Sequence, residues 1–592
     1  MFRSVASFAL ALAIYLHAPA ALAGPLTDQG TQPSSLTHPV VSAGDCGGCH
    51  GDFEPSSHHE PWPTWSGSMM ANSGRDPLFW AALDVANNDL PGAGDFCLRC
   101  HAPTGWLAGR SEPPSGSVDG CSLEGKIDES DKDFEGVECH LCHRMMVNPS
   151  PPAGQDGVYF ENGQFWLDDT DCNGAGEPCR RGPYSYPADG NPPPPHAWAQ
   201  SDYHESSDLC GNCHNVTSPV HNLIDGGVDT GIPYPIERTF KEWQQSNFAT
   251  IGTTCQNCHM PDVAASPAYA CSDRINDHPG DLPMHTFVGG NTWVPEVLRL
   301  EYPNLDRDQS FIETRNAARA LLQTAASVAL TLPSEVPEGG TLAFDATVTN
   351  LSGHKLPTGY PEGRRMWLHV EARDAGGALL WESGAYDATT GVLTEDAQIK
   401  IYQAKPGVWQ DGECRVEDGG APQFHFVLNN CYRIDNRIPP LGFTGGADPE
   451  TRPVNYTYPP VSAGSDQLVN YDVTSYSVPI PLGTSTPITV NATLRFQTVS
   501  KEYMEFLRDE AVANAFPADC IERSSGFPTE SRGEILYDMW DRRGKSTPED
   551  VASAGGSVTV PEPAPSVALL IASLTLAGVQ RVRLRREEPP RR

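Results

Sequence analysis

The sequence repeats one short motif, Cys-x-x-Cys-His, five times. With 17 Cys and 18 His in 592 residues, chance predicts roughly 0.015 copies of this pattern. Two thiols three residues apart can add to the two vinyl groups of one haem, and the histidine that follows can ligate its iron. The sequence therefore predicts five covalently attached c-type haems. The attaching cysteines are Cys46, Cys49, Cys97, Cys100, Cys139, Cys142, Cys210, Cys213, Cys255 and Cys258, and the iron ligands are His50, His101, His143, His214 and His259.

Two other uses of paired cysteines fit this sequence less well. Zinc ribbons pair Cys-x-x-Cys units without an obligatory histidine after them, and a thioredoxin-type dithiol normally occurs once in a chain. The distances between successive motifs are also irregular, which argues against a solenoid with one haem in each repeat. Haem attachment remains the interpretation that explains all five copies.

The charge of the chain excludes one broad class of function. The sequence has 40 basic and 75 acidic residues, for a formal net charge of −35. Nucleic-acid binding depends on neutralising phosphates with basic side chains. We therefore expect no nucleic-acid partner, and the acidic excess suits an exported protein or one that docks cationic partners.

The N-terminus has the pattern of a secretory signal peptide over residues 1–23. Arg3 precedes an apolar run from Phe8 to Leu16, and Ala21-Leu22-Ala23 is a small-residue cleavage pattern before Gly24. The apolar run is short for a membrane anchor, which is the alternative. We expect an exported protein in the periplasm or on the outer surface of a Gram-negative bacterium, where haem attachment also takes place.

Residues 561–592 carry a second sorting pattern. Val560-Pro561-Glu562-Pro563 precedes an apolar stretch at 567–579, and a cluster of arginines follows. This order resembles the PEP-CTERM signal, which an exosortase-type processing enzyme reads and removes. The alternative is a short tail anchor. We expect membrane contact only through this segment.

Between these ends the hydrophobic period changes from helical to strand-like. Helical patterns cover 77–86, 239–249 and 307–328, whereas 342–348, 367–372 and 488–494 alternate with period two. We predict an α+β fold, in which a loop-rich, mainly α multihaem domain is followed by an antiparallel β-sandwich domain. The predicted parts are a pentahaem domain at 24–300, a connecting helix at 301–328, the sandwich at 329–498, a helical segment at 499–545 and a linker at 546–560.

Several segments around the motifs share a recognisable pattern. They are Trp65-x-x-Ser68-Met69-Met70, Gly105-Trp106-Leu107, Gly136-Val137-Glu138-Cys139, Leu209-Cys210-Gly211, Thr239-Phe240-x-Glu242-Trp243, His259-Met260-Pro261 and Gly353-His354-Lys355-x-Pro357-Thr358-Gly359. They resemble the multihaem c-type cytochromes related to the tetrahaem electron acceptor of hydroxylamine oxidoreductase. The resemblance covers most of 44–545. It implies electron transfer at a periplasmic or surface site and fixes no partner.

Five irons need five further ligands if all are six-coordinate. We expect His204, which precedes Cys210 by six residues, His285, which resembles a family ligand, and His354, which lies in a glycine-flanked turn. His196 is the fourth choice. Met69 or Met70 is the fifth, since a thioether also ligates haem iron. The reserves are His58, His59 and His140.

Seven cysteines lie outside the motifs. In an exported chain we expect the pairs Cys172–Cys179 and Cys414–Cys431, and the odd count leaves one thiol free or paired between chains.

A calcium-loop pattern overlaps the first of these pairs. Asp169, Asp171 and Asn173 match the start of such a loop, but Arg180 stands where an EF-hand needs a glutamate. A looser Ca²⁺ site and an acidic turn closed by a disulfide both remain open.

The main functional prediction is a non-enzymatic carrier that passes electrons between redox proteins by hopping along closely spaced haems. No catalytic residue is assigned. The alternative is a multihaem oxidoreductase that acts on hydroxylamine, nitrite or a similar compound. Nitrite reductase relatives use Cys-x-x-Cys-Lys at the reactive iron, and all five motifs here end in histidine. A third reading, a surface binding module, would leave five haems without a purpose.

Overall fold

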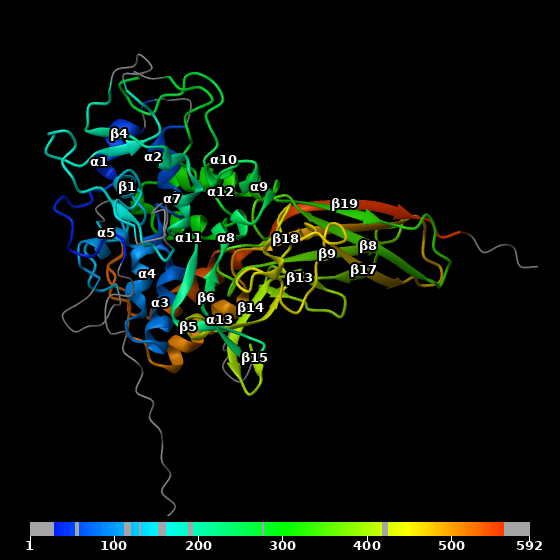
Figure 1. The fold of residues 1–592 in the computed structure, drawn as a ribbon. Coiled ribbons are helices and arrows are strands. Elements are labelled where there is room, and N and C mark those ends of the chain that lie inside the picture. The colour runs from blue at the N-terminus through cyan, green and yellow to red at the C-terminus, as the bar shows by residue number, and fades with distance from the viewer. Residues whose placement is uncertain are drawn as a thin grey trace, which may run out of the picture.

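The computed structural model describes residues 29–51, 53, 59–111, 120–128, 132–151, 161–186, 193–274, 277–416 and 424–561. The predicted signal peptide and all but the first residue of the predicted sorting signal lie outside these residues. Figure 1 shows a helical, loop-rich part that contains the five motifs and a group of long strands that extends from one side of it. We call residues 29–322 the N-terminal half, and 326–498 with 549–558 the β half.

The N-terminal half is built from short helices. Helix α3, Pro77–Asp89, begins with Pro77 at its first position, and the Asp76 carboxylate accepts the backbone N–H of Leu78 at 2.9 Å. The helix predicted at 77–86 is thus confirmed and is one turn longer. The other helices are α1 Gly44–His50, α2 Pro61–Ser66, α4 Ala93–His101, α5 Pro103–Leu107, α6 Cys139–Cys142, α7 Ser207–Gly211, α8 Thr239–Gln244, α9 Asn247–Thr250, α10 Cys255–His259, α11 Trp293–Glu301 and α12 Asp308–Leu322, with single 3₁₀ turns at Ser73–Arg75, Asp202–Glu205 and Pro303–Leu305.

Two predicted helices are shorter in the structure. The segment 239–249 divides into α8 and α9 because the Ser246 side chain caps a new helix by accepting the N–H of Phe248. The helix predicted at 307–328 ends at Leu322. The chain then forms strand β7, Ala326–Thr331, which pairs with the strand at 341–350.

The N-terminal half also contains a long β-hairpin that the sequence analysis missed. Strands β5, Val216–Asp225, and β6, Val228–Glu237, are joined by Gly226 and Gly227, whose φ angles of 56° and 88° suit a two-residue hairpin turn. Prolines within both strands and three register shifts hide the alternation. Four shorter strands accompany them: β1 Met145–Met146, β2 Trp166–Leu167, β3 Arg180–Gly182 and β4 Trp198–Gln200.

The β half consists of antiparallel sheets. One has the order β10-β9-β18-β19, with β13 also paired to β9, a second has the order β17-β8-β7, and a third has β15-β14-β16. The predicted strands at 342–348, 367–372 and 488–494 lie within β8, β9 and β18. The bounds are β8 Thr341–Asn350, β9 Arg365–Arg373, β10 Leu379–Ser383, β11 Tyr386–Asp387, β12 Val392–Leu393, β13 Lys400–Tyr402, β14 Ala404–Gln410, β15 Glu413–Arg415, β16 Cys431–Asp435, β17 Tyr471–Pro479, β18 Ile488–Gln497 and β19 Glu549–Val558, with 3₁₀ turns at Phe426–Leu428, Gly445–Ala447 and Gly544–Ser546.

The first two of these sheets contribute to one hydrophobic core. Alternate residues of β8, such as Leu342 and Val348, are buried together with Val370 of β9 and Val490 of β18. This pattern confirms an α+β fold with antiparallel sheets. The sandwich arrangement itself remains a proposal that the shared core supports.

The linker predicted at 546–560 is wrong. Residues 549–558 form β19, which pairs with β18 from Ile488 to Phe496. Small residues predicted flexibility there, but small side chains are also tolerated in a strand whose partner is fixed along its whole length.

The chain returns to the N-terminal half after β18. Helices α13, Lys501–Ala513, and α14, Arg532–Arg542, lie within the helical segment predicted at 499–545, and both pack against α3. Leu507, Leu536 and Trp540 share a core with Leu83 of α3. A disulfide between Cys121 and Cys520, 399 residues apart, also links this C-terminal segment to the N-terminal half. Within the described residues, no helix has the length and apolar composition of a bilayer span.

This long-range disulfide gives a first testable prediction. We expect the Cys121→Ser/Cys520→Ser variant to lose about 4 kcal/mol of unfolding free energy, because a cross-link that closes a long loop removes much entropy from the unfolded chain. The measurement is denaturant unfolding of the haem-loaded protein. Removing the Cys172–Cys179 pair, separated by seven residues, is the control and should cost about 2 kcal/mol. Equal losses would contradict the entropic argument.

Candidate haem-binding cavity

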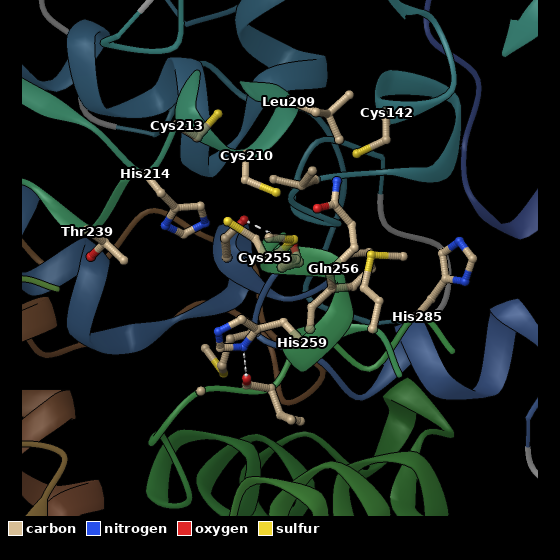
Figure 2. Close-up of a pocket in the computed structure, with 18 of the residues that line it drawn as sticks. Cys142, Leu209, Cys210, Cys213, His214, Thr239, Cys255, Gln256, His259 and His285 are labelled. Atoms are coloured by element: carbon tan, nitrogen blue, oxygen red, sulfur yellow. Dashed lines mark hydrogen bonds between the residues drawn. The ribbon is translucent and has the colours of Figure 1, made fainter. Parts of the chain in front are cut away.

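All five motifs line one cavity of about 1300 Å³ in the N-terminal half. Each of the ten motif cysteines and five motif histidines contributes to its wall. Figure 2 shows part of it, with cysteines from the third, fourth and fifth motifs facing one another. The walls also carry the predicted distal ligands Met69, His196, His204, His285 and His354. The structure thus gathers the motifs and the predicted ligands at one place.

The motifs are not arranged in their sequence order. The Cys46 thiol of the first motif lies beside that of Cys139 in the third. The fourth motif makes two such contacts, from Cys213 to Cys100 of the second and from Cys210 to Cys255 of the fifth.

The third motif approaches the fourth as well. The Cys142 thiol lies close enough to interact electrostatically with both thiols of the fourth motif, Cys210 and Cys213. The fourth motif is therefore central, with the second, third and fifth around it and the first beyond the third.

Short helices present four of the five motifs to the cavity, and α7 holds only Cys210 of the fourth. The first, second and fifth motifs lie wholly in α1, α4 and α10, and the two cysteines of the third motif form the ends of α6. Residues three apart lie on the same side of a helical turn, so both thiols of a motif can face one haem.

Three motif histidines face a second imidazole at one common separation. The ring centroids of His50 and His196 are 6.3 Å apart, those of His143 and His285 are 6.2 Å apart, and those of His259 and His354 are 6.4 Å apart. Metal–nitrogen bonds of about 2.0 Å on both sides, added to two imidazole half-widths, give a centroid separation of about 6 Å. The spacing of the three pairs fits one metal ion between each two rings.

The hydrogen bonds of these six rings leave the same nitrogen free. Each Nδ1–H donates to a backbone carbonyl, so each Nε2 is available as a ligand, which is the usual arrangement at metal-bound histidines. The acceptors are Ala270 for His50, Arg181 for His143, Val288 for His259, Ala197 for His196, Pro283 for His285 and Lys355 for His354, at 2.6–3.2 Å.

Burial favours the neutral form of five of these rings, those of His143, His196, His259, His285 and His354. Desolvation lowers the pKa of His259 to about 4 and that of His285 to about 3. The pKa values of His143, His196 and His354 are lowered for the same reason. Because only a neutral imidazole can ligate iron, the cavity holds them in the form that binding needs.

His204 is placed differently from the other predicted ligands. Its ring stacks on that of His143 at 5.6 Å and 11°. Its Nε2–H donates to the carbonyl of Cys142 at 2.9 Å, and its buried Nδ1 has no partner. His204 and His285 therefore both approach His143. The geometry favours His285 opposite that ring, and His204 remains a ligand candidate through Nδ1.

The second and fourth motif histidines lack an imidazole at the common separation among the residues that the structure describes. His101 stacks face to face on Phe79 at 4.0 Å, and burial lowers its pKa to about 4. His214 lies 3.4 Å from the Glu237 carboxylate. Burial lowers the pKa of His214, but the hydrogen bond and charge of Glu237 outweigh it and leave the pKa raised. Met69 lines the cavity, and its role as a sixth ligand stays a prediction.

The reserve histidines have other surroundings. His140 is buried, and its Nδ1 accepts the N–H of Val41 at 3.0 Å. That nitrogen therefore already has a hydrogen-bond partner. His59 is buried with its Nε2 unpaired, and His58 lies outside the described residues. Sequence reasoning missed Phe79 and Glu237, for which no motif gave a signal.

The calcium prediction is not supported by the loop geometry. The Asp169 carboxylate accepts the N–H of His38 at 2.9 Å and pairs with Arg144 at 2.9 Å. Asp171 accepts the N–H of Gly176 at 2.8 Å. These carboxylates already have partners, and the loop, which also contains Asn173, is an acidic turn closed by a disulfide.

Both predicted short-range disulfides, Cys172–Cys179 and Cys414–Cys431, are confirmed. With Cys121 and Cys520 also paired, Cys271 is the odd thiol outside the motifs, and it lines the cavity beside the first motif.

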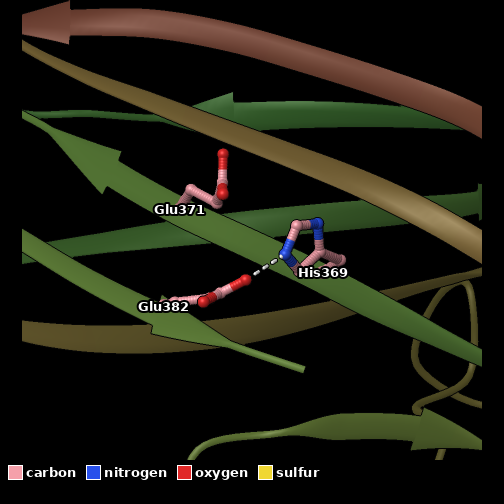
Figure 3. Close-up of side chains that lie close together, drawn as sticks. All are labelled: His369, Glu371 and Glu382. Carbon is pink, nitrogen blue, oxygen red and sulfur yellow. Dashed lines mark hydrogen bonds and ion pairs between the residues drawn. The ribbon is translucent and has the colours of Figure 1, made fainter. Parts of the chain in front are cut away.

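A second group of ligand-type side chains lies on the β half, far along the chain from the motifs. Figure 3 shows His369 and Glu371 of β9 beside Glu382 of β10. The His369 Nε2 pairs with Glu382 at 2.8 Å, and Glu371 pairs with Arg373 at 2.6 Å. Since each charge has a partner, we assign no metal to this group.

Comparisons with known proteins give a likeness in structure. No family model and no curated protein matches the chain. It is similar to the solved structure of a penta-heme cytochrome c552 from Thermochromatium tepidum, with 18% sequence identity and a TM-score of 0.44, over 88% of this chain and 100% of that chain.

Proposed function

We propose that the protein is an exported pentahaem c-type cytochrome that carries electrons between redox proteins. The observation that carries this proposal is that five haem-attachment motifs line one cavity, with cysteines of neighbouring motifs in contact. Haems attached at such cysteines would lie edge to edge. Electrons could then hop between them without a diffusing intermediate.

The chain's own residues have defined roles in this proposal. The ten cysteines anchor the haems, and the motif histidines each supply one iron ligand. His196, His285 and His354 supply second ligands at the first, third and fifth motifs, with His204 and Met69 as candidates elsewhere. When bound, the haems supply reversible one-electron chemistry. The carbonyls that accept the Nδ1–H groups fix the ring orientations.

The surroundings of the protein follow from the same proposal. Electron donor and acceptor would be other redox proteins, reached in the periplasm or at the outer cell surface. Residues 1–23 would direct export, and 561–592 would be removed by an exosortase-type enzyme. The pentahaem domain would be 24–300, with the sandwich domain, predicted at 329–498 and completed by β19, attached to it.

One observation favours the alternative, a multihaem oxidoreductase. Within the described part of the chain, His101 and His214 face no second imidazole at the 6.2–6.4 Å separation seen at the other three motifs. An iron held only there could accept a small nitrogen compound such as hydroxylamine or nitrite. Met69 beside the cavity is the competing occupant for one such position.

The haem count is the direct test of the main proposal. We expect five covalent haems in each mature chain, measured by pyridine haemochrome assay and intact mass. The Cys46→Ser/Cys49→Ser variant is the matched control and should carry four. Four or fewer haems in fully matured wild-type protein would refute the count.

Carbon monoxide separates the carrier from the oxidoreductase. We expect reduced protein to bind it poorly at most haems, because a second imidazole would be available to the iron at three motifs. The measurement is an optical titration of the fully reduced protein. Stoichiometric binding at one haem would instead support the oxidoreductase.

A further inference from the structure

Four charged side chains are buried next to His354. The Lys355 ammonium pairs with Asp435 at 2.7 Å, and Arg437 pairs with the same carboxylate at 2.8 Å. Arg437 also pairs with Glu242 at 3.0 Å. The backbone N–H of Lys355 donates to Glu242 at 3.2 Å, which completes a ring of contacts. We call these four residues the Lys355 network.

The burial of this network makes its charges interdependent. The side chains of Lys355 and Glu242 are 0% exposed, that of Asp435 is 4% and that of Arg437 is 10%. The formal charges of the two cations and the two anions sum to zero. A buried charge is costly without a partner, so removing one member alone leaves an uncompensated charge in the interior.

The network joins three segments that are distant in the sequence. Glu242 lies in α8 of the N-terminal half, Lys355 lies in the loop that follows β8, and Asp435 ends β16. Backbone hydrogen bonds in both directions between Leu356 and Ile438, at 3.0 and 3.1 Å, reinforce the same joint.

The loop held in this way presents His354 to the cavity. The Asn350 side-chain amide donates to the His354 carbonyl at 2.8 Å and to the Ile438 carbonyl at 2.9 Å. Together with the N–H of Lys355, which donates to Glu242, this fixes both polar groups of the peptide that follows His354. Its ring then lies opposite His259, at the separation reported above.

A line of polar contacts continues from the network toward the fourth motif. The Thr358 hydroxyl donates to Glu242 at 2.8 Å and lies 2.8 Å from the hydroxyl of Thr239. Thr239 in turn contacts Glu237 at 3.0 Å, which is the carboxylate beside His214. The network is thus connected to histidines of both the fourth and the fifth motif.

We propose that Lys355, Asp435, Arg437 and Glu242 are positioning residues that hold His354 opposite His259 and thereby couple the seating of the β half to iron ligation at the fifth motif. This inference rests on the proposed function, because it requires a haem at Cys255 and Cys258. In this proposal the β half supplies an iron ligand and holds it in place.

The test removes the anchor without leaving a buried charge unpaired. In Lys355→Met/Asp435→Asn the ion pair is lost as a unit, while Arg437 keeps Glu242. We expect this variant to lose up to one fifth of the low-spin ferric signal, which corresponds to one haem of five, in electron paramagnetic resonance spectra. One midpoint potential should also rise. Lys355→Arg keeps the cation and should retain the full low-spin signal.

Two comparisons make the result decisive. Lys126→Met removes an exposed ion pair with Glu522 and should leave spectra and potentials unchanged. If Lys355→Met/Asp435→Asn and Lys355→Arg both keep all low-spin signal and all potentials, the positioning role is refuted. If His354→Ala also changes nothing, the proposed ligand has failed, whereas a response to His354→Ala alone overturns only the network.

Discussion

Replacing Cys210 and Cys213 by serine is expected to leave a four-haem protein in which electrons no longer equilibrate rapidly among the remaining haems. The reason is the central position of the fourth motif, whose thiols contact those of the second and fifth motifs and lie near Cys142 of the third. Without it, the first and third haems would be separated from the second and fifth. Because tunnelling slows steeply with distance, the loss in rate should be large.

The experiment follows internal electron transfer after a light-driven pulse of reductant. Wild-type protein should reach redox equilibrium in one fast phase, and Cys210→Ser/Cys213→Ser should show an additional slow phase. The matched control is Cys46→Ser/Cys49→Ser, which also lacks one haem, but at the end of the arrangement. Identical kinetics in the two variants would contradict a central fourth haem. Haem counts and circular dichroism confirm that each variant is folded.

The parts of the fold that the sequence predicted are those with a local physical cause. Helix α3 follows from Asp76 and Pro77 at its start, and α13 from its helical pattern after Ser500, whose hydroxyl caps it. Strands β8, β9 and β18 follow from period-two alternation, because one face of each is buried.

The parts that were missed depend on distant segments. Strand β19 consists largely of small residues and exists because β18 and β7 lie beside it. The hairpin of β5 and β6 has prolines that obscure its pattern. Its Gly226-Gly227 turn was the signal that could have revealed it. The Cys121–Cys520 bond joins residues 399 apart, which no spacing rule connects.

In the candidate site, too, local features were predictable from the sequence and long-range ones were not. The motifs were visible as local patterns. His196 and His354 were named from their surroundings in the sequence, and His285 from the resemblance to a family ligand. Their pairing with His50, His143 and His259 was not predictable, because it depends on how the loops cross the cavity. The spatial order of the motifs was equally hidden, since contacts such as that between Cys46 and Cys139 follow from tertiary packing.

Replacing His354 by alanine is expected to convert one haem from low-spin to high-spin and to raise its midpoint potential. The imidazole of His354 faces His259 across 6.4 Å, and its Nδ1–H donates to the Lys355 carbonyl, which leaves Nε2 for the iron. Loss of the imidazole removes an iron ligand that stabilises the ferric state. The β half should stay attached, because the ion pair of Arg437 with Glu242 of α8 does not use the imidazole.

The measurements are ferric spectra and a redox titration of each variant. His369→Ala is the matched control, because His369 is a part-buried histidine of the same β half that pairs with Glu382 and does not line the cavity. It should leave all five haems unchanged. Added imidazole should restore the low-spin spectrum of His354→Ala by filling the vacated position. Unchanged spectra and potentials in His354→Ala would exclude the ligand role and leave the fifth haem dependent on another residue.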